Sequence, residues 1–520
     1  MKSFFIASSL GESSRGDKEN MNYFHEFFFG LSIAFQPWNL LSCFFGVFIG
    51  TLIGVLPGIG PVGTMSLLLP FTFGISPVTG IIMLAGIFYG AMYGGSTTSI
   101  LVNIPGEAVS VVTCLDGYQM ARQGRAGPAL GISALGSFIA GTLSVVGLMF
   151  LANPLAEFAV KFGPAEYFSL MCLGLSVLIY LTQGSILKGL IMAGIGLFLS
   201  LIGQDTITGK GRFTFGLIGL MDGIGLVPLV MGLFGVSEIL LNLERLQERI
   251  VLKTKIKGLY PSREDWRRSA KPIARGTILG FFLGILPGAG GVTATFLSYA
   301  LEKKFSKHPE RFGKGAIEGV AGPESANNAA TGASLVPLFS LGIPSNMIAA
   351  LLLGALMIHG ITPGPFLITQ HPEVFWGTVA SMYVGNAMLL VLNLPLIGIW
   401  VKVLRVPYKT LFPLILLFCL IGSYSIGNNV FDIFVMLFFG GLGYLLRKLN
   451  YEPAPLALAY ILGPMVEQNF RQALIISDGS FGGFLTRPIS AGCIIITFLL
   501  LFSAVLPSLQ RRRKVVIPEQ

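Results

Sequence analysis

Apolar runs close to twenty residues long recur along the whole sequence, and they constrain the fold more than any other feature. Clear runs cover residues 130–152, 167–181, 186–202, 224–241, 378–401, 430–446 and 489–506. A helix needs about 20 predominantly apolar residues to cross the hydrocarbon core of a bilayer. Only 12% of the 520 residues are charged, whereas about 25% is usual in a soluble domain. The sequence therefore predicts a membrane protein.

These runs, together with others that glycine and proline interrupt, predict an all-α polytopic membrane protein with about eleven to thirteen membrane segments. The runs are continuous rather than alternating, which argues against the strands of an outer-membrane barrel. The sequence contains no P-loop and no HExxH motif, and its five cysteines show no CxxC spacing. We therefore expect neither an enzyme nor a bound metal or cofactor.

One short motif occurs twice, each time just after an apolar run. "GVLPGIGPVGT" covers residues 54–64, and "GILPGAGGVTA" covers residues 284–294, so the two copies are 230 positions apart. This offset pairs six glycines and prolines: Gly46 with Gly276, Gly50 with Gly280, Gly54 with Gly284, Pro57 with Pro287, Gly58 with Gly288 and Gly60 with Gly290. The sequence therefore predicts a duplicated unit.

Charge predicts that the two copies have opposite orientations in the membrane. Residues 244–275, before the second motif, hold ten Lys or Arg against four Asp or Glu, whereas residues 36–45 carry no charge. The loop 302–315 is basic while its counterpart 70–77 is uncharged, and a third pair of loops shows the reverse bias. Because short cytoplasmic loops accumulate Lys and Arg, matched loops on opposite sides indicate an inverted repeat. Topology explains the basic excess better than a nucleic-acid partner does.

The same features divide the chain into five parts. We expect an N-terminal extension without assigned role (1–20), a first transmembrane repeat (21–243), a basic cytoplasmic linker (244–275), a second transmembrane repeat (276–510) and a cytoplasmic tail (511–520).

The repeated motif predicts a helix break or re-entrant helix inside each half. Proline removes a backbone donor, and lipid cannot satisfy the groups it frees, so such backbone lies against protein or a water-filled cavity. The alternative is that the glycines only allow close helix packing. We assign Gly46, Gly50 and Gly54 to packing. Pro57-Gly58 and Pro287-Gly288 are interpreted as breaks that offer helix N-termini to an anion.

Two polar clusters accompany the breaks. In "GPESANNAATGAS", Glu324, Asn327, Asn328 and Thr331 follow the i, i+3, i+4, i+7 spacing of one helix face. These residues are interpreted either as the lining of a cavity or, alternatively, as an interfacial loop with a helix cap. In the first half, Ser96 to Ser99 either line the same site or bond the backbone of their own helix. Glu107 and Asp116 are interpreted as surface charges, and Asp222, Glu238, Asp432 and Glu467 as isolated acids.

Several long motifs, in order, resemble one known family. "GVLPGIGPVGTMSLLLPFTFGISP", "YGGSTTSILVNIPGE", "DGYQMARQGRAGPALG", "GPESANNAATGASLVPLFSLGIPSN" and "GITPGPFL" are similar to the large membrane subunit of the tripartite tricarboxylate transporters, the TctA family, over residues 21–505.

This resemblance implies a secondary carrier of the bacterial inner membrane. It implies a small four-helix membrane subunit and a periplasmic solute-binding protein as partners, sodium or protons as the coupling ion, and an elevator-type movement. Its substrates would be citrate and other carboxylates. The resemblance also implies that the position of Glu107 in "NIPGE" varies within the family, so we do not assign Glu107 as a ligand.

We predict a midplane cavity for a di- or tricarboxylate and its coupling cation. The substrate-binding residues are expected to be Pro57, Gly58, Gly60, Thr64, Ser96, Thr97, Thr98, Ser99, Pro287, Gly288, Gly290, Thr293, Asn327, Asn328 and Thr331; Glu324 and Asn103 are expected to serve the cation. The alternatives are a membrane scaffold or sensor that binds a ligand without moving it, and a channel.

Overall fold

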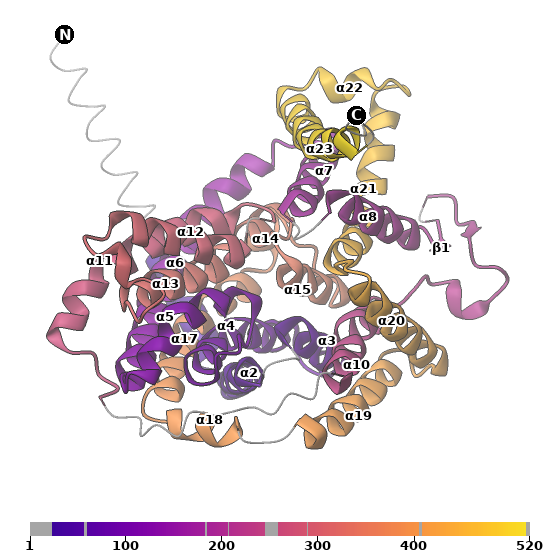
Figure 1. The fold of residues 1–520 in the computed structure, drawn as a ribbon. Coiled ribbons are helices and arrows are strands. Elements are labelled where there is room, and N and C mark those ends of the chain that lie inside the picture. Colours follow the sequence, from indigo (N-terminus) through magenta and orange to yellow (C-terminus); the bar gives the residue numbers. More distant parts are fainter. Residues whose placement is uncertain are drawn as a thin grey trace, which may run out of the picture.

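The fold is almost entirely helical, as the apolar runs predict (Figure 1). The computed structural model describes residues 23–56, 60–181, 185–205, 207–244, 258–288, 290–404 and 408–515. Within these ranges, strands are confined to one antiparallel pair, β1 with β2, in which Gly203 faces Arg212. The all-α fold class is therefore confirmed.

The first half of the chain comprises a helix over residues 23–34 followed by α2 (Pro37–Val55), α3 (Gly60–Thr72), α4 (Pro77–Val102), η1 (Ala108–Ser110), α5 (Val111–Arg122), α6 (Ala126–Ala159), α7 (Pro164–Leu181), α8 (Ile186–Ser200), β1 (Gly203–Gln204), β2 (Gly211–Arg212), η2 (Ile218–Leu220), α9 (Leu226–Val230), the π-helix η3 (Met231–Val236) and α10 (Ser237–Glu244). The second half comprises α11 (Arg263–Ile285), α12 (Gly290–Phe305), η4 (Pro309–Arg311), α13 (Glu318–Ala333), α14 (Leu335–Leu341), α15 (Met347–Ile358), α16 (Leu367–Gln370), α17 (Pro372–Asn393), α18 (Ile397–Val403), α19 (Tyr408–Gly427), α20 (Val430–Lys448), α21 (Ala454–Ile476), α22 (Gly482–Leu485) and α23 (Pro488–Val515).

Many of these helices have the length and composition of membrane spans. Six in the described ranges are long and apolar enough to cross a bilayer: Pro37–Val55, Pro77–Val102, Ala126–Ala159, Leu226–Glu244, Pro372–Asn393 and Val430–Lys448. Shorter apolar helices of 10–17 residues accompany them. The chain is thus a multi-pass membrane protein. The expected number of eleven to thirteen segments stays a prediction.

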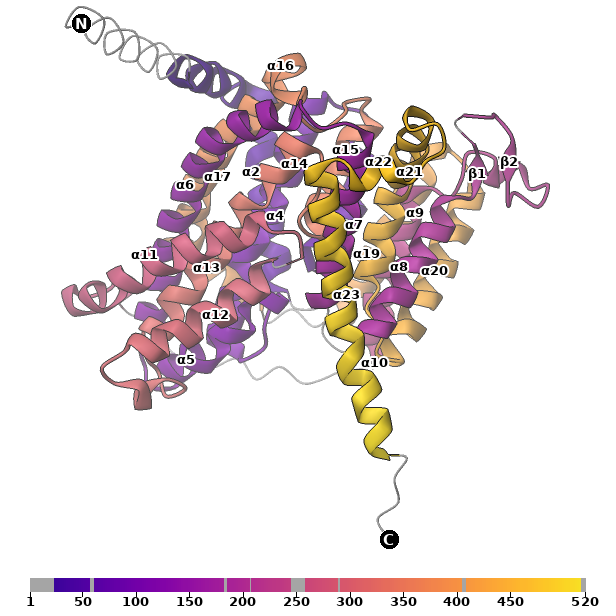
Figure 2. The same ribbon diagram turned by 90° about the horizontal axis from the view of Figure 1, so that it is seen from above.

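The helices form two groups that lie side by side. In the first group, α2 packs along α4, α11 along α13, and α13 against α6. In the second group, α21 packs against α7 and α8, α23 against α7, and α20 against η3. Seen from above, α7 and α23 lie between the α11–α13 side and the α8, α19 and α20 side (Figure 2). α3 connects the groups because it contacts α4 on one side and η3 and α19 on the other.

Glycine allows the closest contacts of the first group. Gly46, Gly50 and Gly54 lie directly against the backbone of α4, where a Cβ atom at Gly50 would be 2.5 Å from the carbonyl oxygen of Ile87. Gly276, Gly280 and Gly284 lie in the same way against α13. Small residues let two helix backbones approach where lipid supplies no hydrophobic force between them. The packing role predicted for Gly46, Gly50 and Gly54 is confirmed.

The structure repeats these elements at the spacing found in the sequence. α2 ends at Val55 and α11 at Ile285, while α3 begins at Gly60 and α12 at Gly290, and both pairs are 230 positions apart. The later helices α4 and α14 of the two units also end in the same way. Asn103 after α4 and Gly342 after α14 both cap their helices in the left-handed conformation and precede an Ile-Pro pair. The inverted relation of the two units stays a prediction.

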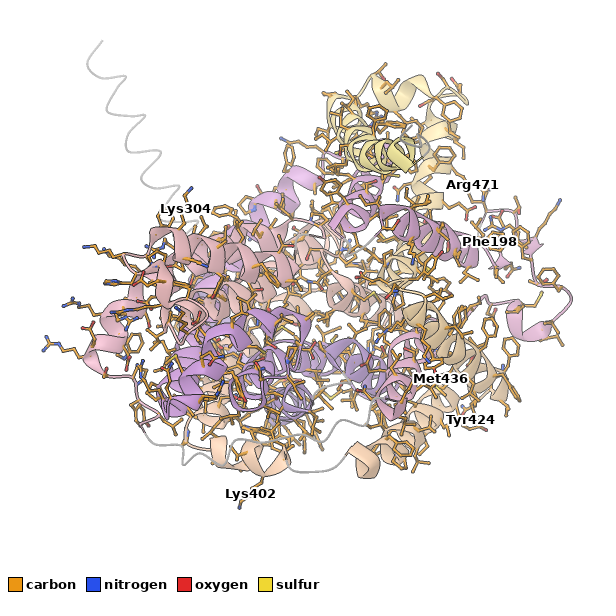
Figure 3. All side chains as sticks on the ribbon, in the orientation of Figure 1. Phe198, Lys304, Lys402, Tyr424, Met436 and Arg471 are labelled. Carbon is orange, nitrogen blue, oxygen red and sulfur yellow. The ribbon has the colours of Figure 1, made fainter. Side chains whose placement is uncertain are left out.

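Charged side chains concentrate at the rim and in the loops. The side chains of Lys304 and Lys402 point outward, whereas Met436 is buried between helices (Figure 3). The hairpin of β1 and β2 is fixed to α21 by the pair of Asp205 with Arg471, 3.0 Å apart. The backbone amide of Ile207 and the Arg471 guanidinium hold the pKa of Asp205 well below its usual range. This hairpin therefore keeps its anchor in mildly acidic solution.

Two substitutions of glycine by alanine separate packing from helix propensity. Alanine favours an ordinary helix interior by about 1 kcal/mol over glycine. Gly50→Ala should nevertheless lower stability by about 1–3 kcal/mol, because its methyl group overlaps α4. Gly441→Ala in α20 is the control, because no atom lies within 4 Å of its Cβ position. Thermal unfolding of the purified protein in detergent should show a loss for Gly50→Ala alone, and equal behaviour of the two variants would contradict the packing role.

The inverted relation can be tested by labelling from each side of the membrane. Gly74 and Lys307 are exposed and follow α3 and α12, so they occupy matching loops of the two units. We expect a membrane-impermeant maleimide to label Gly74→Cys and Lys307→Cys from opposite faces of sealed vesicles, in a variant whose five native cysteines are replaced. Labelling of both positions from one face would show that the units are parallel.

Candidate functional site

Two helix N-termini lie just after the predicted breaks. α3 begins at Gly60 and α12 at Gly290, and both glycines have positive φ angles, 66° and 45°. An L side chain is strained in this conformation, so glycine lets the chain turn sharply into each half-helix. Pro57 and Gly58 lie outside the described residues. The first N–H groups of a helix have no partner in the helix itself, and they favour an anion.

The chain before each half-helix is held by the rest of its own unit. Thr98 donates its hydroxyl to the carbonyl of Val55 at the end of α2, at 2.7 Å. In the second unit, the amide of Gly288 donates to the carbonyl of Ser345, at 2.8 Å. The preceding residue, Pro287, lies against Gly174 of α7 in the other helix group. The end of α2 and the Pro287-Gly288 break are therefore held by contacts with the rest of the protein.

The η1 segment brings the two N-termini together. The Gly60 Cβ position lies 3.8 Å from both carboxylate oxygens of Glu107, and the Gly291 Cβ position lies 2.9 Å from a methyl group of Val109. Because Glu107 and Val109 are two residues apart, the start of α3 and the start of α12 face the same short segment. The structure thus gathers the two motifs at one place.

Asn327 is the polar side chain that lies at the start of α12. Its Oδ1 atom is 3.2 Å from the Cβ position of Gly291. The side chain is only 1% exposed, and neither Nδ2 nor Oδ1 has a hydrogen-bond partner among the described residues. A buried amide without partners costs free energy. The Asn327 amide is therefore available to bind a ligand or a water molecule at the α12 N-terminus.

Glu324 lies one turn earlier on α13 and faces hydroxyl groups. Ser96 donates to its Oε2 at 2.5 Å, and Thr113 donates to its Oε1. The side chain is 1% exposed, and none of the ion pairs in the described ranges involves it. A buried carboxylate with hydroxyl neighbours and no basic partner holds either a proton or a cation.

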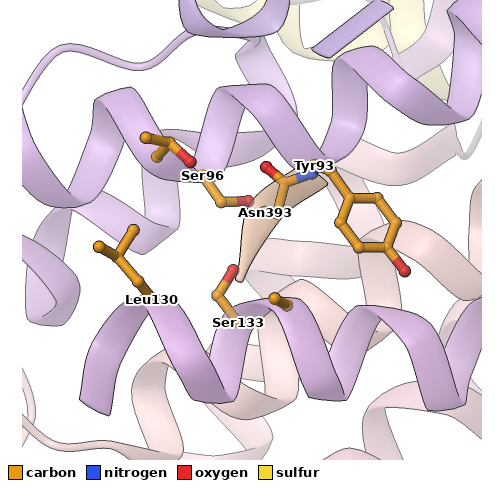
Figure 4. A pocket seen from close by; sticks show the side chains of 7 residues that line it. Tyr93, Ser96, Leu130, Ser133 and Asn393 are labelled. Atoms are coloured by element: carbon orange, nitrogen blue, oxygen red, sulfur yellow. The ribbon is translucent and has the colours of Figure 1, made fainter. Parts of the chain in front are cut away.

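A small pocket adjoins this carboxylate between α4 and α6. The hydroxyls of Ser96 and Ser133 face it (Figure 4). Thr97 and Asn393 also line it, and the Oδ1 atom of Asn393 is buried without a hydrogen-bond partner. Oxygen atoms are the ligands that hard cations prefer. The pocket and Glu324 therefore offer a suitable set of donors for a small cation.

The remaining predicted residues fall into three sets. Asn328 donates to Ser137 of α6 at 2.7 Å, so it ties α13 to α6. Hydroxyls that bond the backbone of their own unit belong to Thr64, Thr98, Ser99 and Thr331. Thr293 is half-buried in the first turn of α12, and Asn103 is exposed at the end of α4. The structure does not bring Asn103 to the Glu324 carboxylate, and the substrate roles of all these residues stay predictions.

The acids interpreted as surface or isolated charges mostly have specific partners. Asp116 is fully buried and accepts hydrogen bonds from Tyr299 and from the amides of Gly315 and Ala316. The surface reading of Asp116 was wrong, because its carboxylate caps the chain that enters α13. Glu238 pairs with Arg447, and Glu467 with Arg212. Their spacing in the sequence gave no signal of these partners.

Comparison with known proteins identifies the family of this chain. The model of the "Tripartite tricarboxylate transporter TctA family" matches residues 40–458. The chain belongs to the TctA family.

Two curated relatives come from Agrobacterium vitis. The "Uncharacterized 52.8 kDa protein in TAR-I ttuC' 3'region" is 53% identical over 94% of this chain and 98% of its own length. The "Uncharacterized protein in TAR-II ttuC' 3'region" is 52% identical over 46% of this chain and 99% of its own length. No solved structure matches the chain. As a member of this family, the chain is the large subunit of a tripartite tricarboxylate transporter.

The charge of Glu324 can be tested through its hydroxyl donors. A hydrogen bond to a charged group contributes about 1.5–3 kcal/mol, and one between neutral groups about 0.5–1.5 kcal/mol. Ser96→Ala removes a donor to Glu324, whereas the control Ser99→Ala removes bonds to the carbonyls of Gly95 and Ser110 only. Thermal unfolding in detergent at neutral pH should therefore show the larger loss for Ser96→Ala. Equal losses would indicate that Glu324 is uncharged in the resting protein.

Proposed function

We propose that this TctA subunit imports a di- or tricarboxylate such as citrate across the bacterial inner membrane together with sodium ions or protons. One observation carries the proposal: the N-termini of α3 and α12 face the same η1 segment, beside the unpartnered amide of Asn327.

The chemistry of this place suits carboxylate groups. Backbone N–H groups at a helix N-terminus and the positive end of the helix dipole attract anions. The Asn327 amide supplies a further donor through Nδ2 and can accept a substrate hydroxyl through Oδ1. The described residues that form the site, from Gly60 to Thr64 and from Gly290 to Thr293, include no lysine or arginine. Main-chain dipoles would therefore carry most of the anion recognition.

The electrical cost of import calls for a coupling cation. Moving one elementary charge against a membrane potential costs about 2.3 kcal/mol per 100 mV. A substrate with two or three negative charges enters an inside-negative cell against this potential, so co-transported cations must offset it. Glu324 and the adjoining pocket lined by Ser96, Thr97, Ser133 and Asn393 are the place we propose for the sodium ion or proton.

The two helix groups support an elevator-type movement. The α2–α4 and α11–α13 units carry both half-helices and their polar residues in one group. The contacts with the other group include α3 against η3 and α19, α15 against α21, and Pro287 and Gly288 against α7. A relative displacement of the groups at these contacts would expose the site first to one side of the membrane and then to the other.

The family's tripartite organisation supplies the partners. We propose that the small four-helix membrane subunit lies beside this chain in the bilayer, and that a periplasmic solute-binding protein delivers the carboxylate. A scaffold or sensor that only binds its ligand is the alternative function, and it predicts saturable binding without accumulation.

Asn327→Ala should abolish uptake while the protein stays in the membrane, because the amide at the start of α12 is lost. The control is Asn469→Ala, since Asn469 bonds only the carbonyl of Met465 in its own helix. Uptake of labelled citrate, succinate and malate is measured in proteoliposomes that contain all three subunits, with a sodium gradient, a proton gradient or neither. Normal uptake by Asn327→Ala would reject the site. Binding without accumulation under every gradient would favour the scaffold.

A further inference from the structure

Glu107 lies at the site although its sequence context gave it no role. The Gly60 Cβ position at the start of α3 is 3.8 Å from each of its carboxylate oxygens, and on its other side Glu107 lies against Gly95 of α4. The backbone amide of Glu107 donates to the Ser110 hydroxyl, and this hydroxyl donates to the backbone carbonyl of Glu107, so the main chain at Glu107 is fixed. The carboxylate therefore lies close to the α3 N-terminus.

The hydrogen bonding of Glu107 differs from that of Glu324. The hydroxyls of Ser96 and Thr113 donate to the Glu324 carboxylate, and donors of this kind favour the charged form of an acid. By contrast, the Oε1 atom of Glu107 is buried and has no hydrogen-bond partner among the described residues. A buried carboxylate oxygen that lacks a donor favours the protonated acid, which needs one donor fewer and carries no charge.

None of the ion pairs among the described residues involves Glu107. α3 and α4 contain no charged residue within their bounds. The charged group that acts on Glu107 from the other helix group is Glu238 of α10, which has the same sign and is paired with Arg447. The acids of the other elements packed against η1 have partners of their own: Asp116 with Tyr299, Glu302 with Arg275, Glu318 with Arg268, and Glu324 with its hydroxyls.

We propose that Glu107 is a proton-binding site that takes up a proton when a carboxylate binds beside Asn327 at the start of α12. The proposal rests on the proposed function, because it places the substrate at that half-helix. Val109 contacts the α12 N-terminus and Glu107 the α3 N-terminus, so a bound anion and the Glu107 carboxylate are neighbours on either side of η1. Two negative charges this close in a site of low dielectric repel each other strongly. Protonation of Glu107 removes the repulsion.

Thermodynamic linkage determines whether substrate affinity rises or falls with pH. If the anion raises the affinity of Glu107 for a proton, then the proton raises the affinity of the site for the anion by the same factor. Substrate affinity should therefore fall as pH rises and Glu107 loses its proton. Glu107→Gln carries no charge at any pH, and it leaves the backbone bonds of this residue with Ser110 in place. Its affinity should be independent of pH and, in alkaline solution, higher than that of the wild type.

The test is calorimetric titration of the purified subunit in nanodiscs with citrate, succinate and malate, using whichever binds most tightly. Measurements run between about pH 8 and 10, far enough above the pKa values of ordinary carboxyl groups, about 4, that all carboxyls of the three ligands are almost fully ionised. Buffers of different ionisation enthalpy reveal the number of protons taken up. We expect wild type to take up a proton and to lose about tenfold or more in affinity across this range. Glu107→Gln should do neither, and Glu310→Gln, at an exposed acid of the same charge, should behave like wild type.

Each outcome bears on a different claim. If wild type binds none of the three carboxylates, the proposed function fails. If it binds one without proton uptake, or if Glu107→Gln still takes up a proton, the role of Glu107 is overturned while the substrate site stands. A purely structural role of Glu107 predicts weaker binding of Glu107→Gln at every pH. Should Glu107→Gln fail to fold, infrared difference spectra of the wild type still decide: the carbonyl band of a protonated carboxylic acid must appear when the anion is added.

Discussion

The structure depends on one constraint: main chain that leaves the helix inside an apolar protein needs partners for its N–H and C=O groups. This chain meets it twice at matching positions, where α2 passes into α3 and α11 into α12. The close packing of α2 on α4 and of α11 on α13 brings backbone carbonyls and hydroxyls to the broken segments, as the bond from Thr98 to Val55 shows. The first amides of α3 and α12 have no such intrahelical partners, so they are available for the anion recognition that we propose. The same glycines that permit the packing therefore make the site possible.

The sequence predicted the breaks because their signals are local. Proline and glycine determine φ angles and remove donors wherever they stand, so the positions of Val55, Gly60, Ile285 and Gly290 follow from the motif itself. The glycine spacing of four residues likewise specifies one helix face. The membrane class and the family also follow from patterns that extend along the chain. The β1–β2 hairpin and the π-helix η3 were not predicted, because pairing across a short turn and one local insertion leave little trace in an apolar sequence.

The individual contacts of the polar residues could not be predicted, because they depend on which neighbouring helix each helix face packs against. Asn327 and Asn328 are adjacent in the sequence, yet Asn328 bonds Ser137 of α6 while Asn327 faces the start of α12. Both residues were predicted to bind the substrate. The hydroxyls of Ser96 and Ser99 differ in the same way, since one meets a carboxylate and the other a backbone carbonyl. Only the packing of α13 against α4, α6 and α12 makes these distinctions.

Glu107 shows why an acid near a helix end should be judged by its donors rather than by its place in the sequence. Following a turn after a membrane helix, it looks like an ordinary surface charge, but the structure turns its carboxylate toward the N-terminus of α3. Glu324 is buried and Glu107 is half-buried, and the two acids have different environments. Glu324 has hydroxyl donors and an adjoining pocket with further oxygen atoms, which suits an anionic ligand of a cation. Glu107 has an oxygen without a donor and an anion site as its neighbour, which suits a proton. A carrier arranged in this way could couple substrate entry to a metal cation and a proton at separate places, and the total positive charge moved with each carboxylate would then exceed what either acid provides alone.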